Sequence, residues 1–226
     1  TDAKKVLGRA IPAGNGIEDG ERVLDILVKR RETAEFIATK LLRYLWGYAP
    51  PARAIRKVKR VFQQTDGDIR SMVRTALSET GMRTATPKLK RPFHLAISSL
   101  RALGADVSNP YGVLDHLSEA GHELFAWTPP NGYPDSVEYW SGFVLPRWNF
   151  AANLFNQDTA VDPSVDDPTG PVSKIVRRFD SVLLAGTMSS STRVAIEKFL
   201  EKEPLNRNRV REAIGLVLTS PEFQEY

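Results

Sequence analysis

The amino-acid sequence predicts an all-α fold in which many helices pack as an orthogonal bundle. Apolar residues recur along most of the chain at the three- and four-residue spacing of a helix face. Prolines and glycines fall mainly between these segments, where helices begin and end. No segment shows a convincing alternation of apolar and polar residues, which a half-buried strand requires. A short hairpin is considered only in an irregular, aromatic-rich loop segment at residues 125–150.

Four helices are predicted in the first eighty residues, each with an apolar stripe at helical spacing. The clearest stripe consists of Ile69, Met72, Val73 and Ala76. The third helix begins at Pro51, because the missing N–H of proline is not needed in a first turn. The four helices cover approximately residues 18–29, 32–46, 51–65 and 68–78.

Six further helices are predicted, and glycines follow several of them, as at Gly104, Gly121 and Gly186. Between the third and fourth of these helices, residues 156–170 are acidic, proline-rich and poor in large apolar side chains, so they are predicted to form a loop or linker. The helices cover approximately residues 88–103, 111–119, 143–155, 171–185, 191–200 and 208–219. We therefore expect one helical domain over residues 1–155, the linker, and C-terminal helices at 171–226 that pack on the same core.

Composition narrows the classes of function. With 226 residues and 42% hydrophobic content, the chain can bury a sizeable core. A formal net charge of +4 is only a weak indication of an anionic partner. No apolar run is long enough to span a bilayer, so no membrane span is predicted. The absence of cysteine excludes disulfides and thiolate metal sites.

No cofactor or metal site is predicted. The three histidines, His94, His116 and His122, lack the spacing of a metal-ligand pair. The glycines between residues 8 and 20 do not form a phosphate-binding or dinucleotide motif. The chain also begins without methionine in a glycine-rich stretch, from which we expect an N-terminal part of the same protein to precede it.

A basic arc lies on the predicted third helix. Arg53, Arg56, Lys57 and Arg60 share one side of that helix and could bind a polyanion. The alternative is an ordinary solvated face, which the modest net charge and the lack of a nucleic-acid motif favour. A nucleic-acid partner is therefore not expected.

Several motifs occur in an order that resembles one bacterial family. They are GIEDG at Gly16–Gly20, TAEFIATKL at Thr33–Leu41, TDGDIR at Thr65–Arg70, KLKRPF at Lys88–Phe93, TPPNGYPD at Thr128–Asp135, RWNFA at Arg147–Ala151 and LTSPEFQ at Leu218–Gln224. The chain resembles the C-terminal part of the family catalogued as domain of unknown function 1800. The resemblance implies a piece of a larger protein that is exported from bacterial cells, and it implies no reaction, substrate or catalytic residue.

The aromatic-rich segment is the best candidate for a site. Aromatic faces stack on sugar rings or flat ligands, and interleaved polar side chains can hydrogen-bond hydroxyls or an anionic group. The candidate ligand-binding residues are Trp127, Asn131, Tyr133, Asp135, Trp140, Arg147 and Asn149. The alternative is structural, because an irregular segment packed over helices needs bulky anchors and turn residues of the Asn-Gly and Pro-Asp kind.

Two classes of function follow. The leading hypothesis is a binding or scaffolding role, in which the aromatic-rich segment contacts a glycan, a polymer or a protein partner. The alternative is a hydrolase-like enzyme whose active site is completed by the preceding N-terminal part, with polar groups from His122, Asp135 or Arg147. Convergence of these three side chains at one pocket would favour the enzyme.

Overall fold

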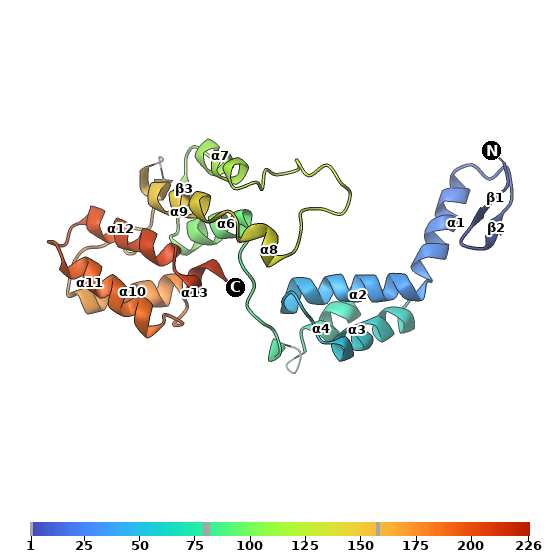
Figure 1. Ribbon diagram of the computed structural model, residues 1–226, viewed down its shortest axis with the longest axis horizontal. Coiled ribbons are helices and arrows are strands. Elements are labelled where there is room, and N and C mark those ends of the chain that lie inside the picture. The colour runs from blue at the N-terminus through green and yellow to red at the C-terminus, as the bar shows by residue number, and fades with distance from the viewer. Residues whose placement is uncertain (1, 79–81, 157–158) are drawn as a thin grey trace. The chain divides into compact units, whose positions relative to one another are not determined.

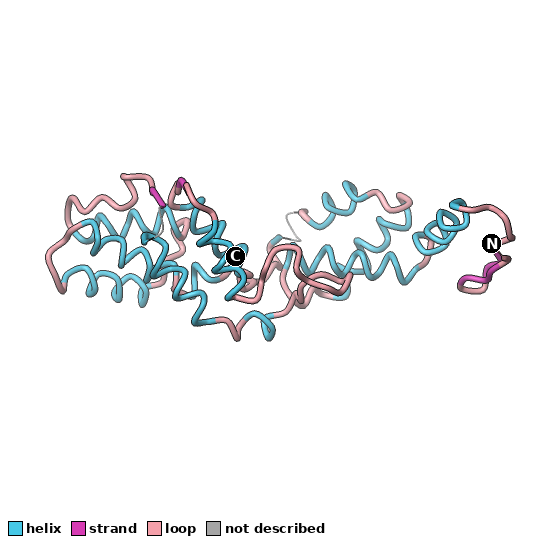
Figure 2. The backbone as a smooth tube through the Cα atoms, turned by 90° about the horizontal axis from the view of Figure 1, so that it is seen from above, coloured by secondary structure: helices cyan, strands magenta, loops and turns pink. Residues whose placement is uncertain are grey.

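The all-α prediction is confirmed. A computed structural model describes residues 2–78, 82–156 and 159–226. These residues contain twelve α-helices, one short 3-10 helix and two small two-stranded antiparallel sheets. Figure 2 shows how short the strands are beside the helices. The chain divides into two compact units, unit 1 (Thr1–Pro87) and unit 2 (Lys88–Tyr226), and each is described by itself.

The elements named among the described residues of unit 1 are a hairpin followed by four helices (Figure 1). Its elements are β1 (Lys4–Val6), β2 (Arg9–Ile11), α1 (Ile17–Val28), α2 (Arg31–Trp46), α3 (Ala52–Gln64) and α4 (Ile69–Ala76). The hairpin, which pairs Lys4 with Ile11, was not predicted from the sequence. Strands of three residues are too short to give a clear alternating pattern, so the prediction missed them.

The core of unit 1 lies between α2, α3 and α4. Small residues such as Ala34 and Ala38 on α2 let the helices approach closely, and α3 contributes Val58 and Phe62. On α4 only part of the predicted apolar stripe is buried: Met72 is 1% exposed, whereas Ile69 is 69% exposed. The other members of this core are Leu42, Trp46, Ala54 and Ala76.

A glycine allows the chain to turn sharply after α2. Gly47 has a φ of 121°, and a Cβ at this position would lie 2.1 Å from the Thr86 side-chain oxygen. The N–H of Thr86 donates to the Trp46 carbonyl oxygen at 2.7 Å. The residue that follows the core tryptophan must therefore be a glycine, because any side chain would collide with this segment.

Unit 2 contains the remaining helices and a two-residue pairing of β3 with β4. Its elements are α6 (Pro92–Ala102), β3 (Asp106–Val107), α7 (Tyr111–Glu119), α8 (Val137–Trp140), α9 (Val144–Asn153), η1 (Leu154–Asn156), β4 (Thr159–Ala160), α10 (Val172–Leu183), α11 (Ser190–Glu201), α12 (Arg207–Leu218) and α13 (Pro221–Gln224). One core cluster joins α6, α9, α10 and α12, with Leu95, Phe150, Phe179 and Ile214 among its members. The helices after residue 171 therefore share a core with helices before residue 155, while the division between units falls after Pro87.

The helix predicted over residues 88–103 begins only at Pro92. The preceding residues are extended and pair with the C-terminal segment, since the N–H of Lys88 donates to the Tyr226 carbonyl at 3.0 Å and the N–H of Lys90 donates to the Gln224 carbonyl at 2.7 Å. The prediction was wrong for residues 88–91, because pairing partners more than 130 residues away take up their backbone groups.

The stretch predicted as a loop or linker begins with Asn156, the last residue of η1, and has no helix over residues 159–170. It is nevertheless attached to the core, because Val165 is 4% exposed and Asp166 is 1% exposed. The Asp166 carboxylate lies 2.8 Å from Arg211 Nε and 3.6 Å from Arg207 Nε, both on α12. A buried carboxylate with two arginine partners fixes this loop to the helix.

Candidate functional site

The aromatic-rich segment begins in a long irregular loop between α7 and α8 (Figure 1). The described part of the chain has no strand between residues 125 and 150, so the short hairpin considered there is wrong. Pro129, Pro130 and Pro134 remove backbone donors that a hairpin ladder needs. The loop turns instead through a side-chain hydrogen bond, which Trp127 Nε1 donates to Asn131 Oδ1 at 3.1 Å.

Trp140 anchors this loop to unit 2. Its ring is fully buried, and Nε1 donates to the Pro134 carbonyl at 2.7 Å. Its ring centroid lies 4.8 Å from that of His122, 4.7 Å from that of Tyr139 and 5.8 Å from that of Tyr133. Close edge and tilted contacts of this kind stabilise an aromatic cluster. Trp140 therefore acts as a core residue.

Tyr133 belongs to the same cluster at its outer side. Its ring is half-buried and lies 4.7 Å from the His122 ring and 4.8 Å from the Trp127 ring, between centroids. Its hydroxyl donates to the Glu123 carbonyl at 2.7 Å. Trp127 is half-buried as well, whereas Asn131 is exposed. These three predicted residues cluster on the loop, and the rings of Trp127 and Tyr133 contact each other and other rings of the aromatic cluster.

Asp135 forms two ion pairs. Its carboxylate lies 2.9 Å from Lys88 Nζ and 2.9 Å from an Arg91 guanidinium nitrogen. Burial raises the pKa of Asp135, but hydrogen bonds from Lys88 and Arg91 outweigh burial, and the pKa lies below its ordinary value. Asp135 thus connects the loop to the extended segment before α6.

Arg147 connects the same extended segment to the C-terminal residues. It is 3% exposed and donates to the Lys90 carbonyl at 2.6 Å and to Gln224 Oε1 at 3.0 Å. The neighbouring Lys90 ammonium donates to the Phe223 carbonyl at 2.6 Å and lies 3.8 Å from the centre of the Phe223 ring. Burial lowers the pKa of Lys90 to about 8. Arg147 therefore serves the packing of three chain segments.

The three side chains expected of an enzyme are each held by a different part of residues 88–93. Asp135 and Arg147 have the partners just described, and His122 Nδ1 accepts a hydrogen bond from the Phe93 N–H at 3.3 Å. Burial, with the nearby Arg91 and His94, lowers the pKa of His122 to about 4. None of the three lines either of the cavities described below. Neither of these two cavities is therefore the shared pocket that an enzyme would need from these three side chains.

A groove lies beside this segment, between α9 and α12, with a volume of about 750 Å³. We call it the α9–α12 groove. The residues that line it are Trp148, Ala151, Ala152 and Phe155 on one side, and Asn208, Arg211, Glu212, Gly215, Leu216 and Thr219 on the other. Of the predicted site residues, Asn149 lies on the same helix as Trp148 and is exposed.

Small residues where the helices meet explain the groove. Gly215 faces α9 so closely that a Cβ there would lie 3.2 Å from the Ala151 carbonyl oxygen. Because the backbones approach each other at this point, larger side chains stand up on either side of it. Trp148 is 54% exposed and Leu216 is 44% exposed. The close contact therefore leaves a depression between the helices, with the exposed side chains of Trp148 and Leu216 at its edge.

The charged side chains of the groove, Arg211 and Glu212, are oriented by neighbouring charged residues. The Arg211 guanidinium is fixed by the buried Asp166 and lies 5.4 Å from the centre of the Phe155 ring. Glu212 Oε2 accepts from Arg209 at 3.2 Å, while its side chain is 60% exposed. A site whose polar groups are already oriented loses little entropy when a ligand binds.

None of the seven candidate residues lines this groove. Trp148 belongs to the aromatic-rich segment but was not a candidate, and neither was any residue of α12. One signal was available: Gly215 interrupts an otherwise helix-forming segment, where glycine costs about 1 kcal/mol relative to alanine. A glycine inside a helix indicates close approach of another backbone.

Two absences hold for residues 2–78, 82–156 and 159–226. None of their helices is long and apolar enough to cross a membrane. Nor do they contain a group of three or more histidine, aspartate or glutamate side chains that could hold a metal ion.

Comparison with known proteins finds a matching family. The sequence profile of the family described as "Protein of unknown function (DUF1800)" matches residues 1–225. No curated protein and no solved structure matches the chain.

Proposed function

The chain belongs to the DUF1800 family, proteins of unknown function, and from this premise we propose that it is a binding protein whose α9–α12 groove holds a glycan chain. The observation that carries the proposal is the Trp148 ring, which is 54% exposed at the edge of a groove rather than covered by its own fold. An exposed indole face is a stacking surface for the apolar side of a sugar ring.

The polar residues of the groove suit a ligand rich in hydroxyl groups. Arg211 and Asn208 offer hydrogen-bond donors, and Glu212 and Thr219 offer acceptors. Sugar hydroxyls donate and accept at once, so donors and acceptors together match them better than a single sign of charge would. Ligand sites in general combine an apolar surface with a few placed polar groups.

A protein partner is the competing ligand. α9 also exposes Val144 at 42% and Leu145 at 65%, and exposed apolar side chains can mark protein interaction surfaces. Neither of them lines the groove. Glycan binding should depend on Trp148 alone among these residues, whereas docking of a protein on α9 should also depend on Leu145.

Replacing Trp148 by alanine is expected to weaken glycan binding about tenfold, because the stacking surface is lost. Trp148→Phe should retain most of the affinity, since it keeps a flat ring. The measurement is isothermal titration calorimetry with cellohexaose, chitohexaose and maltohexaose as probes.

The matched control is Leu145→Ala, an exposed apolar residue on the same helix outside the groove. It should change the dissociation constant by less than about twofold. Failure of all three hexasaccharides to bind, or equal losses in Trp148→Ala and Leu145→Ala, would contradict a glycan site in the groove.

An exported bacterial location, which the family resemblance implies, is part of the same proposal, because structural glycans lie mainly outside the cell membrane. We expect the native protein in the envelope or culture-medium fraction of the producing bacterium. Immunoblotting of fractions against a cytosolic marker measures this, and recovery with the marker would contradict it.

A further inference from the structure

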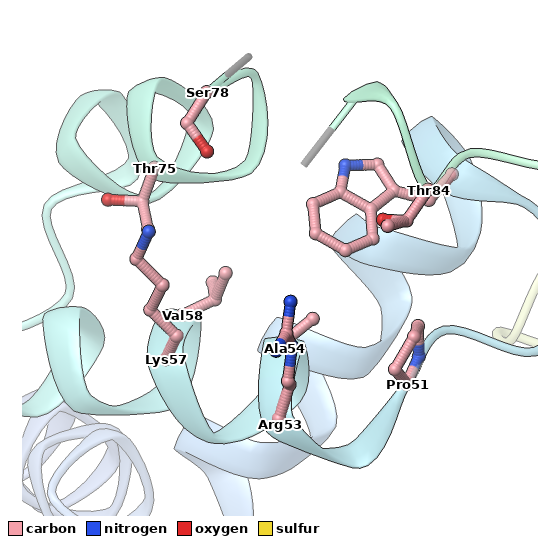
Figure 3. A pocket seen from close by; sticks show the side chains of 9 residues that line it. Pro51, Arg53, Ala54, Lys57, Val58, Thr75, Ser78 and Thr84 are labelled. Atoms are coloured by element: carbon pink, nitrogen blue, oxygen red, sulfur yellow. The ribbon is translucent and has the colours of Figure 1, made fainter. Parts of the chain in front are cut away.

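Unit 1 contains a cavity of about 310 Å³ that the proposed function does not use (Figure 3). It is formed within unit 1 by the end of α2, the first half of α3, the end of α4 and the nearby Thr84. The residues that line it are Trp46, Pro51, Arg53, Ala54, Lys57, Val58, Thr75, Ser78 and Thr84.

Two cations face this cavity. Arg53 and Lys57 are one helical turn apart on α3, and Figure 3 shows the Lys57 side chain extending toward Thr75 of α4 while Arg53 rises from α3 beside Ala54. Neither takes part in an ion pair among the described residues. By contrast, the next lysine on this helix, Lys59, lies 2.6 Å from a Glu35 carboxylate oxygen.

Within the part of the chain that the structure describes, neither α3 nor α4 carries an acid that offsets these charges. The first turn of α3 contains no acidic residue, and α4 contains none. The nearest acid before α4, Asp68, is occupied as the cap of that helix, where it accepts from the Ser71 N–H at 2.8 Å. Two positive charges on one wall therefore define a site for an anion.

Hydroxyl groups and an apolar floor complete the cavity. Thr75 and Ser78 lie opposite the two cations (Figure 3). The hydroxyl of Thr75 already donates to the Ser71 carbonyl at 2.8 Å, so Ser78 is the better donor for a ligand. Trp46 and Val58 supply apolar surface beside the charged groups.

We propose that this cavity binds a small phosphate monoester, with Arg53 and Lys57 holding the phosphate and the apolar surface contacting the organic part. Arginine binds phosphate oxygens with paired N–H donors, and lysine adds a point charge. The volume exceeds what a phosphate ion alone fills, which leaves room for an ester group of the size of one ring.

The test is calorimetric titration of the whole chain with phenyl phosphate near physiological salt, beside benzyl alcohol as an uncharged probe. Arg53→Gln and Lys57→Gln should each weaken phenyl phosphate binding about tenfold, the effect of losing one charge-assisted hydrogen bond. Benzyl alcohol should show no saturable binding. The side chains of Arg53 and Lys57 are exposed, so both variants should fold as the unmodified chain does, and circular dichroism checks this.

The matched control is Arg56→Gln, an exposed cation on the same helix that does not line the cavity. Its affinity should stay within about twofold of the unmodified chain. Absence of saturable phenyl phosphate binding would overturn the proposal. Equal losses in Arg53→Gln and Arg56→Gln would overturn it too, because they would indicate general attraction to a basic helix.

Discussion

Replacing Trp140 by alanine is expected to lower the free energy of unfolding by about 3–5 kcal/mol. The ring is fully buried among His122, Tyr133 and Tyr139, and its Nε1 holds the Pro134 carbonyl at 2.7 Å. The substitution removes the largest fully buried side chain and leaves the loop before α8 without its anchor. Urea denaturation followed by near-ultraviolet circular dichroism measures the loss.

Trp148→Ala is the control for this experiment. Trp148 is 54% exposed on α9, so its removal should cost less than about 1 kcal/mol. The two tryptophans thus separate stability from binding: Trp140 should affect unfolding, and Trp148 should affect only ligand affinity. A Trp140→Ala protein with unchanged stability would show that its ring does not anchor the loop.

Acidification from about pH 7 to about pH 5 is the second large effect, and we expect it to destabilise unit 2 through its histidines. Burial lowers the pKa of both His116 and His122 to about 4, whereas in the unfolded chain each should titrate near about 6.5. Arg147 adds to the effect at His116, and Arg91 and His94 add to it at His122. Burial lowers the pKa of His94 as well.

The sign of the effect follows from these pKa values. As the pH falls below about 6.5, the two histidines become protonated in the unfolded chain but stay neutral in the folded one. The unfolded state therefore binds more protons, and lowering the pH favours unfolding. The loss between about pH 7 and about pH 5 should be about 2 kcal/mol for each of His116 and His122. It should keep growing until the pH passes the folded pKa values near 4.

Substitution can assign this acid sensitivity. His116 stacks on Phe150 with centroids 4.4 Å apart, and its Nε2 has no hydrogen-bond partner among the described residues. His116→Phe should therefore keep the packing and remove one titrating group. Urea denaturation of this variant at several pH values should show a smaller loss between pH 7 and 5 than the unmodified chain does; an unchanged loss would exclude His116 as a cause.

Local patterns were sufficient to predict most helices. The helix over Tyr111–Glu119 was predicted with the bounds that α7 has, because apolar spacing and the glycine after it are properties of neighbouring residues. The prediction failed where distant residues decide, as at residues 88–91, which pair with the C-terminal segment. Backbone pairing across the fold leaves no periodic signal in either segment.

The candidate site could be predicted only in part. Trp140 and Trp148 are the same residue type eight positions apart, yet one is fully buried and the other is 54% exposed. Nothing in their immediate neighbours distinguishes them, because exposure depends on which helices pack above each ring. The α9–α12 groove was equally hidden, since its two sides come from helices separated by α10 and α11.

The buried Asp166 also determines where this chain can be divided. Composition alone would place a domain boundary within residues 156–170, because linkers between domains are commonly polar and rich in proline. A cut there would remove Val165 from the core and deprive Arg211 of its carboxylate, so each fragment would expose surfaces that had been complementary. A fragment intended to fold by itself should instead contain all of residues 88–226.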